Sequence, residues 1–571
     1  MNNRLENIFH GIRLIGVASI VLSLIFSVIY LIMPNRIALF TIAPWTFLLA
    51  IFSSCILLYQ LLSQEQSIIR QSKTILLLSG VIIPLFMIFA LLSFLLIFLI
   101  PNTYFRTFSE IPTLYVLLYG TYFGTLLLAA GVHFLHHKSE RLEKEATKGD
   151  RKEYYTLSAI SGTKKYKIIK ILALWGSIFL NLVCILFMIV FFLGDLIIFG
   201  AIGIAVAPFS LFYIPVFLGN LVIFAQVGKK LNPKFFKTFI IIGVIGSSTM
   251  LIPVISTPHM IRQGEQNFAE AFGEDWNERI SQEARSSFME TPFAFQEYYL
   301  GSPEPECIVL TDRLYYAGDS GVDDGIRLHY DAYLPTKPGI GQNSTIIRIH
   351  GGAWVLGDKG QGNFLEVNKY FAAQGYVVFD VQYGIYDIGV DTVITEEHQK
   401  GNFTLHDMVR HLGIFTQHLI ANQHEYGANL SSTFISGGSA GGQLASGVAL
   451  GIASGDYPEM FGTGIEIKGL IPFYPANGLA ENILDADTIF HDPADLVTEN
   501  SPPALIIHGD KDGLVPPHIA RDFQDAYYAV GRTECAIIWH SFAGHAGDLH
   551  YFGPYSQVGL YFMERFLYLH R

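Results

Sequence analysis

The chain has 571 residues, of which 51% are hydrophobic, and its mean hydropathy is +0.37. It is too long for one ordinary domain and too apolar for a purely soluble protein, so part of it should lie in a membrane. Residues 1–257 carry a net charge of +11 and residues 258–571 a net charge of −23. The acidic second half lacks the basic surface that binds phosphate, which excludes nucleic acid as its expected partner.

Long apolar runs dominate the first half. Six of them approach the roughly 20 residues that a helix needs to cross the hydrocarbon core, and they lie at 11–33, 37–63, 74–100, 113–135, 168–192 and 238–257. A further run, 195–227, contains Pro208 and Pro215 and is open to three interpretations: one kinked span, a span preceded by a re-entrant piece, or two short helices. The first run is followed at once by others, unlike a cleavable signal peptide.

Lys and Arg residues indicate the orientation, because they are retained on the cytoplasmic side. Residues 136–167 hold nine of them, and residues 228–237 add four lysines. Both segments lie inside if 195–227 crosses once, whereas two crossings would place the second one outside. We therefore predict an α-helical transmembrane bundle of about seven spans over 1–257, with a cytoplasmic N-terminus and an extracytoplasmic second half. The spans show no series of paired charges, so we expect an anchor rather than a transporter.

An acidic linker over 258–304 follows the bundle. Its aromatic and aliphatic residues recur at helical spacing, at Phe268, Phe272, Trp276 and Ile280. This predicts an amphipathic helix that lies on the membrane or packs on the following domain, and its acidic face favours the second arrangement.

From residue 305 the pattern changes to short apolar runs that alternate with helical stretches. Residues 308–316 and 327–334 read as a hairpin. Further strands are expected at 345–349, 376–381, 433–435, 469–473, 504–507 and 535–539. Helices are expected near 363–374, 402–425, 439–454, 516–529 and 555–569. Such alternation predicts an α/β domain over 305–571 with a mainly parallel central sheet covered on both faces.

The chemistry of this domain is expected on the loops after its strands, because the working residues of an open α/β sheet lie at the carboxyl ends of the strands. The run that starts at Phe434 ends in Gly437-Gly438-Ser439-Ala440-Gly441, a G-x-S-x-G pattern that presents a serine on a sharp turn. The strand 345–349 leads into His350-Gly351-Gly352. Two consecutive glycines there let backbone N–H groups face a developing oxyanion, and His350 can hold the loop by hydrogen bonding.

Two more strand ends supply a carboxylate and an imidazole. The strand 504–507 precedes His508-Gly509-Asp510-Lys511-Asp512, and the strand 535–539 precedes a loop with His545. Serine, acid and histidine, in that order along the chain, are what an α/β-hydrolase requires.

With these motifs, residues 305–571 resemble the α/β-hydrolase superfamily, specifically its hormone-sensitive-lipase-like and carboxylesterase group. The HGG and G-D-S-A-G-G motifs of that group look like His350-Gly351-Gly352 and Gly437–Gly442. The HGGAW form is also similar to that of prenylcysteine methylesterases and kynurenine formamidases. Two departures concern the substrate pocket or its support: Gly438 replaces an acidic residue, and Asp380-Val381-Gln382-Tyr383 replaces the usual D-Y-R.

The resemblance implies a role for each site residue. Ser439 would attack the carbonyl carbon, His545 would accept and later return the proton, and Asp512 would orient the imidazole. The family's H-G-x-x-D pattern selects Asp512 over Asp510. The oxyanion hole and its support would comprise the N–H groups of Gly351, Gly352 and Ala440, with His350, Gly437 and Gly441 holding the motifs.

No cofactor or metal is implied. The four cysteines form no C-x-x-C pair, and Cys307 and Cys535 could be either a disulfide or two free thiols. His540 and His550 flank His545, but no carboxylate pair or cysteine with zinc spacing accompanies them. Asp407 is expected to be a packing or capping group. His133, His136 and His137 are expected to be solvated beside the basic loop.

The predicted function is hydrolysis of a carboxylic ester through an acyl-serine intermediate by a membrane-anchored enzyme. Closeness to the bilayer favours a lipid or cell-envelope ester as substrate. An acyltransferase or deacetylase acting on such a substrate remains an alternative. A receptor or transporter with a catalytically dead hydrolase-like binding module is a second one, although such a module would not need serine, aspartate and histidine together.

Overall fold

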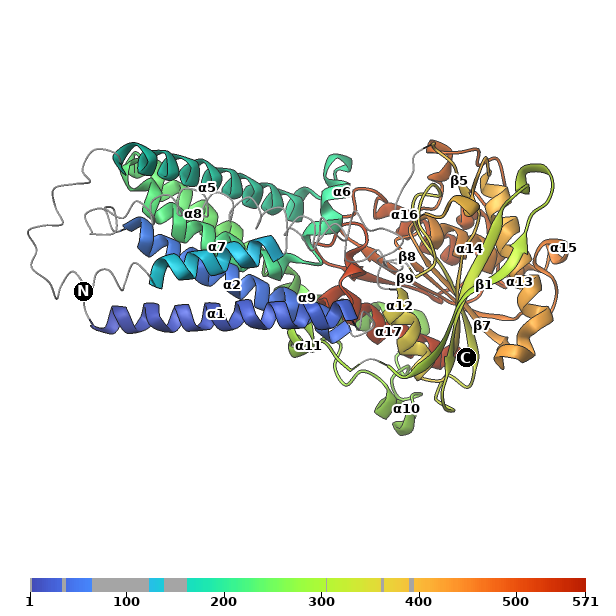
Figure 1. The fold of residues 1–571 in the computed structure, drawn as a ribbon. Coiled ribbons are helices and arrows are strands. Elements are labelled where there is room, and N and C mark those ends of the chain that lie inside the picture. The colour runs from blue at the N-terminus through green and yellow to red at the C-terminus, as the bar shows by residue number, and fades with distance from the viewer. Residues whose placement is uncertain are drawn as a thin grey trace, which may run out of the picture.

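The structure is a computed structural model, and it describes residues 3–32, 37–63, 123–137, 162–303, 305–360, 364–389 and 395–571. A helical bundle occupies one end of the molecule and an α/β domain the other (Figure 1).

The bundle is built from helices, most of which are long and apolar. They are α1 (Asn3–Ile32), α2 (Ile37–Ser63), a helix over 123–137, α5 (Gly162–Leu193), α6 (Ile197–Val206), α7 (Ser210–Val227), α8 (Pro233–Thr249) and α9 (Ile252–Phe272). Four stretches are long and apolar enough to cross a membrane: Ile8–Phe26, Ile171–Leu193, Ser210–Lys230 and Pro233–Phe272.

The predicted spans meet this structure unevenly. The runs 11–33, 37–63 and 168–192 fall on α1, α2 and α5, whereas the run 238–257 is divided between α8 and α9. The run 74–100 lies outside the described residues, and the run 113–135 is described only from residue 123. The count of seven spans therefore stays a prediction.

The segment 195–227 forms two helices rather than one. The short α6 ends at Val206, a turn at Pro208 follows, and α7 continues with Pro215 inside it. Proline lacks an N–H group and clashes with the preceding turn, which explains why the helix breaks at Pro208. Of these two helices, only α7 is long enough to cross a bilayer.

Two histidines of the bundle differ from the expectation of solvation. His133 and His136 are buried. His133 Nε2 lies 3.4 Å from Ser53 Oγ, and His136 pairs with Gln60. The helix over 123–137 packs against α2, and this packing buries both histidines together with their polar partners on α2.

Helix α9 carries the chain from the bundle into the α/β domain. Asn267 Nδ2 donates to the Ile537 carbonyl at 2.7 Å. The side chains expected on one amphipathic helix, Phe268, Phe272, Trp276 and Ile280, are buried in a core that helix α17 (Pro554–His570) shares. Helix α9 ends at Phe272, however, so Trp276 and Ile280 lie in the turn and bend that follow it. The short helices α10 (Gln282–Ser287) and α11 (Phe295–Leu300) complete the connection.

The central sheet has eight strands in the order β1-β2-β4-β3-β7-β8-β9-β10. Its strands are β1 (Cys307–Ala317), β2 (Arg327–Pro335), β3 (Ser344–Ile349), β4 (Val377–Val381), β7 (Asn429–Gly438), β8 (Ile467–Phe473), β9 (Ala504–Gly509) and β10 (Cys535–His540). The β1–β2 and β2–β4 pairs are antiparallel, and every other pair is parallel. The prediction of a mainly parallel sheet is confirmed. Cys307 and Cys535 lie on opposite edge strands, and no disulfide joins them.

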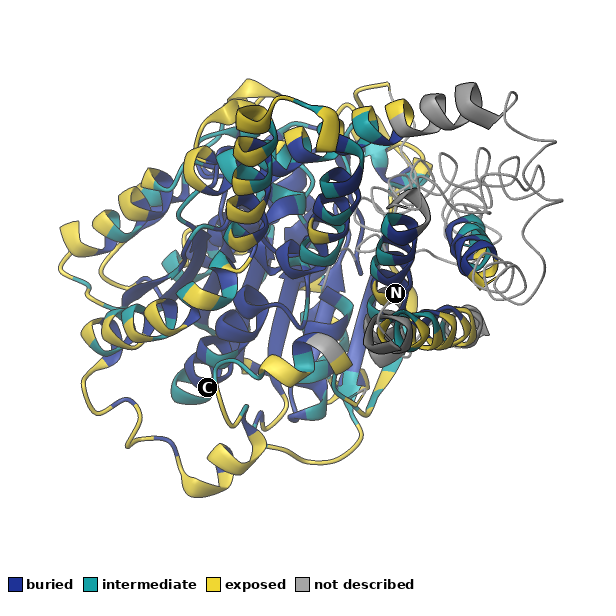
Figure 2. Ribbon diagram, turned by 90° about the vertical axis from the view of Figure 1, so that its left-hand side faces the viewer, coloured by how far each residue is buried: buried dark blue, intermediate teal, exposed yellow. Residues whose placement is uncertain are grey.

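Helices cover both faces of this sheet. On one face lie α13 (Leu405–Tyr426), α14 (Ala440–Ser454) and α16 (His518–Ala529). On the other face lie α9, α17 and α12 (Phe364–Ala373). Figure 2 shows the strands as buried, between helices whose outer sides are exposed. The carboxyl ends of the parallel strands are thereby fixed at one edge of a rigid core, which is where the predicted site residues lie.

Candidate active site

Ser439 stands at the turn between β7 and α14. Its backbone has φ 57° and ψ −122°, a strained conformation for a residue with a side chain. Close backbone approach explains the glycines around it. A Cβ atom on Gly437 would lie 2.2 Å from the Gly441 carbonyl oxygen, and one on Gly441 would lie 2.2 Å from the Ile349 carbonyl oxygen. Only glycine fits either position, so this part of the motif is dictated by packing.

Three predicted side chains form one hydrogen-bonded chain. Ser439 Oγ lies 3.0 Å from His545 Nε2, and His545 Nδ1 lies 2.7 Å from Asp512 Oδ2. They come from the loops after β7, β10 and β9. Asp512 and His545 are buried, whereas Ser439 keeps partial contact with solvent. The distances match those that proton transfer between a nucleophile and a base requires.

The Asp512 carboxylate is held from two sides. Its Oδ1 accepts backbone hydrogen bonds from Leu514 at 2.9 Å and Val515 at 2.8 Å, while Oδ2 faces His545. Burial raises the pKa of Asp512, but the neighbouring His545 and these hydrogen bonds outweigh it, and the net pKa lies below its ordinary value. Asp512 is therefore a stable anion at the end of the chain.

Asp510, the rival carboxylate, points elsewhere. Its Oδ1 accepts a hydrogen bond from the Phe542 N–H at 2.6 Å. Burial raises the pKa of Asp510 to about 6. It fixes the loop that carries His545 but does not contact the imidazole.

The His350-Gly351-Gly352 loop lies beside the serine. A Cβ atom on Gly351 would lie 3.3 Å from Ser439 Cβ. His350 Nδ1 donates to the Gly351 carbonyl at 2.8 Å, and the ring stacks on Tyr383, whose hydroxyl donates to the His350 carbonyl at 3.1 Å. Among the described residues, no backbone carbonyl accepts a hydrogen bond from the Gly351 or Gly352 N–H. Ala440 is the first residue of α14, where N–H groups lack intrahelical partners.

A buried polar layer under this loop was not foreseen from the sequence. Arg348 of β3 pairs in register with Asp380 of β4, donates to Ser436 Oγ at 3.1 Å and lies over the Phe364 ring. Burial raises the pKa of Asp380 to about 7 and lowers that of Arg348 to about 10. An arginine inside an apolar strand run was the available signal, because a buried charge needs a partner.

Both departures from the family pattern lie at packed positions. Gln382 is buried, accepts from the His329 N–H at 2.8 Å and donates to Asp358 Oδ1 at 2.5 Å. A side chain at Gly438 would meet the Tyr474 hydroxyl at 3.2 Å. The Tyr474 ring lies edge-on to His545 with 4.7 Å between ring centroids, so a residue that sequence reasoning missed packs on the imidazole.

The two histidines that flank His545 are isolated from each other. His540 packs on Tyr555, and His550 lies among Phe209, Phe212 and Tyr298. Burial lowers the pKa of both His540 and His550 to about 3, which keeps them neutral. In the described part of the chain, no group of His, Cys, Asp and Glu residues could hold a metal ion.

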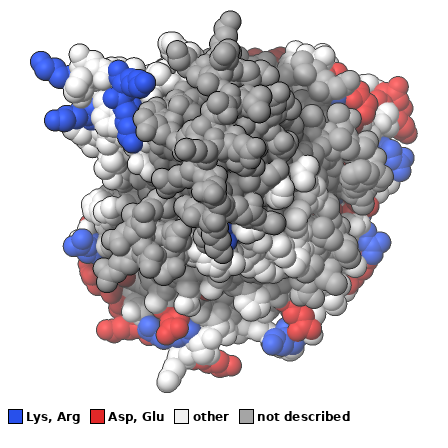
Figure 3. Space-filling model, turned by 60° about the vertical axis from the view of Figure 1, so that its left-hand side comes forward, with Lys and Arg blue, Asp and Glu red and all other residues white. Residues whose placement is uncertain are grey.

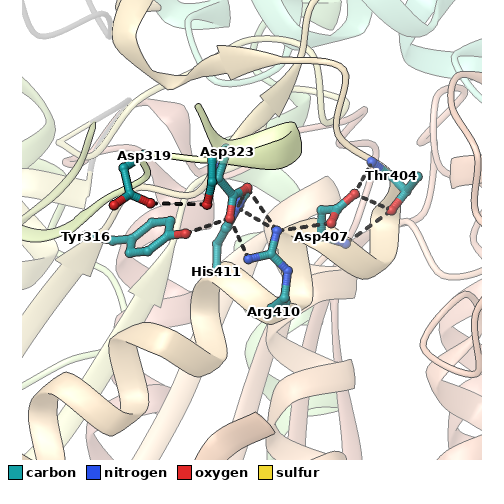
Figure 4. A network of polar contacts seen from close by, with 9 residues as sticks. Tyr316, Asp319, Asp323, Thr404, Asp407, Arg410 and His411 are labelled. Carbon is teal, nitrogen blue, oxygen red and sulfur yellow. Dashed lines mark hydrogen bonds and ion pairs between the residues drawn. The ribbon is translucent and has the colours of Figure 1, made fainter. Parts of the chain in front are cut away.

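Asp407 has the capping role that its sequence indicated. It forms a capping box with Thr404 at the start of α13 and an ion pair with Arg410 at 3.0 Å. Arg410 also binds Asp323, which accepts from Tyr316 at 2.6 Å and lies 3.0 Å from His411 Nε2 (Figure 4). The network joins the β1–β2 turn to α13, away from Ser439 in the chain of contacts, and is structural.

Comparisons with known proteins relate this domain to esterases at low identity. Residues 330–481 match the family described as BD-FAE. "Esterase LipC" of Mycobacterium tuberculosis is 26% identical over 240 residues, 38% of this chain and 55% of that protein. "Probable carboxylic ester hydrolase LipM" of the same organism is 25% identical over 273 residues, 42% of this chain and 58% of that protein. The chain spans about half the length of these curated relatives.

A solved structure to which this chain is similar is that of a thermophilic esterase, Est2, from Thermogutta terrifontis with bound propionate. It is 24% identical, covers 43% of this chain and 85% of its own, and superposes with a TM-score of 0.34.

Proposed function

We propose that this chain is a membrane-anchored serine hydrolase that cleaves a carboxylic ester through an acyl-serine intermediate. The observation that carries the proposal is the chain of contacts Ser439–His545–Asp512, with 3.0 and 2.7 Å between the interacting atoms. The similarity of residues 330–481 to the BD-FAE family and of the domain to two curated esterases supports the same chemistry.

The reaction follows from this geometry in two halves. Ser439 Oγ attacks the carbonyl carbon while its proton passes to His545 Nε2, and the tetrahedral intermediate collapses when the ester C–O bond breaks. The alcohol leaves with the proton from His545. Water then attacks the acyl carbon and gives a proton to His545. The bond between that carbon and Ser439 Oγ breaks, Oγ takes the proton back from His545, and the acid is released. Asp512 holds the imidazole in one tautomer and stabilises its charged form throughout.

The N–H groups of Gly351, Gly352 and Ala440 are the proposed oxyanion donors. Gly351 is next to Ser439, and Ala440 follows it directly. Each such donor contributes about 10² to 10³ in rate. The contacts of His350 with Gly351 and Tyr383 keep the loop in place, and the packing of Gly437 and Gly441 sets the angle of the serine.

The anchor and its orientation complete the proposal. Lys229, Lys230, Lys234 and Lys237 lie where α7 ends and α8 begins, whereas Gly194, at the end of α5, approaches the Lys511 carbonyl of the hydrolase domain. Figure 3 shows a group of Lys and Arg side chains at one corner of the bundle. Because basic segments stay inside, we place the hydrolase domain outside, where a lipid or cell-envelope ester is its substrate.

The test measures p-nitrophenyl acetate hydrolysis by the full chain and by Ser439→Ala. Loss of essentially all turnover is expected in Ser439→Ala, and wild-type turnover is expected in Ser454→Ala. Ser454 is the last residue of α14, and its hydroxyl bonds to the backbone of Gly451 and Asp456. Unchanged turnover in Ser439→Ala would reject the assignment. Release of free acetate in water identifies hydrolysis. Transfer of the acetyl group to an added alcohol, without release of free acetate, would identify an acyltransferase.

A further inference from the structure

Helix α6 stands between the membrane-spanning helices and the hydrolase domain (Figure 1). Its ten residues, Ile197–Val206, include no polar side chain. Gly200, Gly203 and Val206 are buried, whereas Ile197 and Ile198 are 80% and 74% exposed. A helix that is apolar all round is stable in an apolar environment, so the exposed side of α6 requires an apolar neighbour.

The buried side of α6 touches both loops that carry the proposed catalytic residues. A Cβ atom on Gly544, the residue before His545, would lie 3.1 Å from Gly203 Cα. A Cβ atom on Gly513, the residue after Asp512, would lie 2.7 Å from the Leu196 carbonyl oxygen. These backbones meet without side chains between them. The helix is therefore separated from Ser439 by little more than the His545 loop.

Two side-chain contacts join the end of α5 to the same loops of the hydrolase domain. The rings of Phe192 and Phe542 meet edge-on at 6.1 Å. Lys511 Nζ lies 3.9 Å from Asp195 Oδ1. This polar pair lies where the membrane span Ile171–Leu193 has just ended, which is the expected depth of a bilayer surface.

Lipid acyl chains are the neighbour that the exposed side of α6 indicates. The exposed apolar side chains of the preceding span lead directly to Ile197, namely Trp175, Phe179, Leu182, Phe192 and Leu193. The exposed apolar surface of α5 continues onto α6 at Ile197 and Ile198. Because the α5 surface faces lipid, these two isoleucines face the same lipid.

Resting on the proposed function, we infer that α6 lies in the bilayer surface beside the active site, and that Ser439 acts on esters whose acyl chains remain in the membrane. Each methylene group of an acyl chain makes its partitioning from the membrane into water about four-fold less favourable. An active site beside a membrane-embedded helix avoids that transfer, because the substrate reaches it by lateral movement.

The experiment uses the full chain in phosphatidylcholine vesicles with p-nitrophenyl palmitate in the bilayer and p-nitrophenyl acetate in the water. The variant Ile197→Asn/Ile198→Asn is compared with Ile308→Asn/Val322→Asn, in which the replaced side chains are 47% and 57% exposed at the opposite edge of the sheet. We expect the α6 variant to lose about ten-fold or more of palmitate turnover, the equilibrium value of one buried isoleucine, and to keep acetate turnover. The control variant should match the wild type on both.

Undiminished palmitate turnover in the α6 variant, or an equal loss on both substrates, would overturn the inference. A measurement without substitutions provides a second test. Phosphatidylcholine with a diazirine in its acyl chain should crosslink to residues 192–201 of the wild-type protein. Crosslinks confined to other spans, or a crosslink from α6 to a second copy of the chain, would contradict it. Absence of acetate turnover in the wild type would instead reject the proposed function, so the two failures are distinguishable.

Discussion

Asp510 and Asp512 provide a matched pair of substitutions, because they are two residues apart on one loop and only one of them contacts the imidazole. Asp512→Asn replaces the carboxylate that lies 2.7 Å from His545 Nδ1 with an amide. The tautomer of His545 is then no longer fixed, and kcat should fall by about 10³- to 10⁴-fold. Asp510→Asn keeps the oxygen that accepts from Phe542, so kcat should stay within about threefold.

The same pair separates catalysis from stability. The folded pKa of Asp510 is raised from 3.8 to about 6 by burial. The folded state therefore binds the carboxyl proton of Asp510 more tightly than the unfolded state does. The free energy of unfolding consequently decreases as the pH rises from about 4 to about 6. Above pH 6 the loss is at most about 3 kcal/mol. Asp510→Asn removes it, so the variant should be more stable than wild type at pH 8, and the difference should vanish near pH 4.

Initial rates on p-nitrophenyl acetate and denaturant unfolding at pH 4 and pH 8 measure both effects on the same samples. Equal kcat values for the two variants, or a larger loss in Asp510→Asn, would refute the assignment of Asp512. A destabilised Asp510→Asn at pH 8 would refute the electrostatic part.

Three further predictions address packing, electrostatics and topology. Gly441→Ala would place a Cβ atom 2.2 Å from the Ile349 carbonyl oxygen, so the free energy of unfolding should fall by about 3 kcal/mol; denaturant unfolding measures it, and a neutral result would contradict the packing. Burial raises the pKa of Asp323, but hydrogen bonds from His411, Arg410 and Tyr316 outweigh it and hold the pKa below its usual range. The ionised carboxylate therefore stabilises the fold above about pH 4, and this stabilisation is lost in acid. Thermal unfolding should show that Asp323→Asn lowers the free energy of unfolding by about 2 kcal/mol at pH 7 and by less at pH 3. A reporter fused after Pro258 should be active only outside the cytoplasm, and a cytoplasmic signal would overturn the proposed orientation.

The strands and the three residues of the proposed triad were accessible from sequence because each signal is local. A short apolar run followed by glycine, serine, aspartate or histidine identifies a strand end without knowledge of the rest. The choice of Asp512 over Asp510 rested on a family pattern. Asp512 Oδ2 lies 2.7 Å from His545 Nδ1, whereas Asp510 Oδ1 accepts from the Phe542 N–H.

Other features depend on registers and contacts that no local pattern encodes. The Arg348–Asp380 pairing requires the alignment of β3 with β4. The break at Pro208 was one of three interpretations of an apolar run. Its consequence is a short helix that packs on the Asp512 and His545 loops, and this packing joins Gly203 to Gly544, far apart along the chain. Burial of His133 and His136 likewise follows from how helices pack, which hydropathy does not determine.

The central claim is that Ser439 is a nucleophile activated by His545. Labelling of the full chain with a fluorophosphonate, followed by peptide mapping, tests it most directly, since the reagent bonds covalently to an activated serine. We predict one modified peptide, containing Ser439, in the wild type and none in Ser439→Ala. A label that persists in Ser439→Ala, or that forms in neither protein, would contradict the claim.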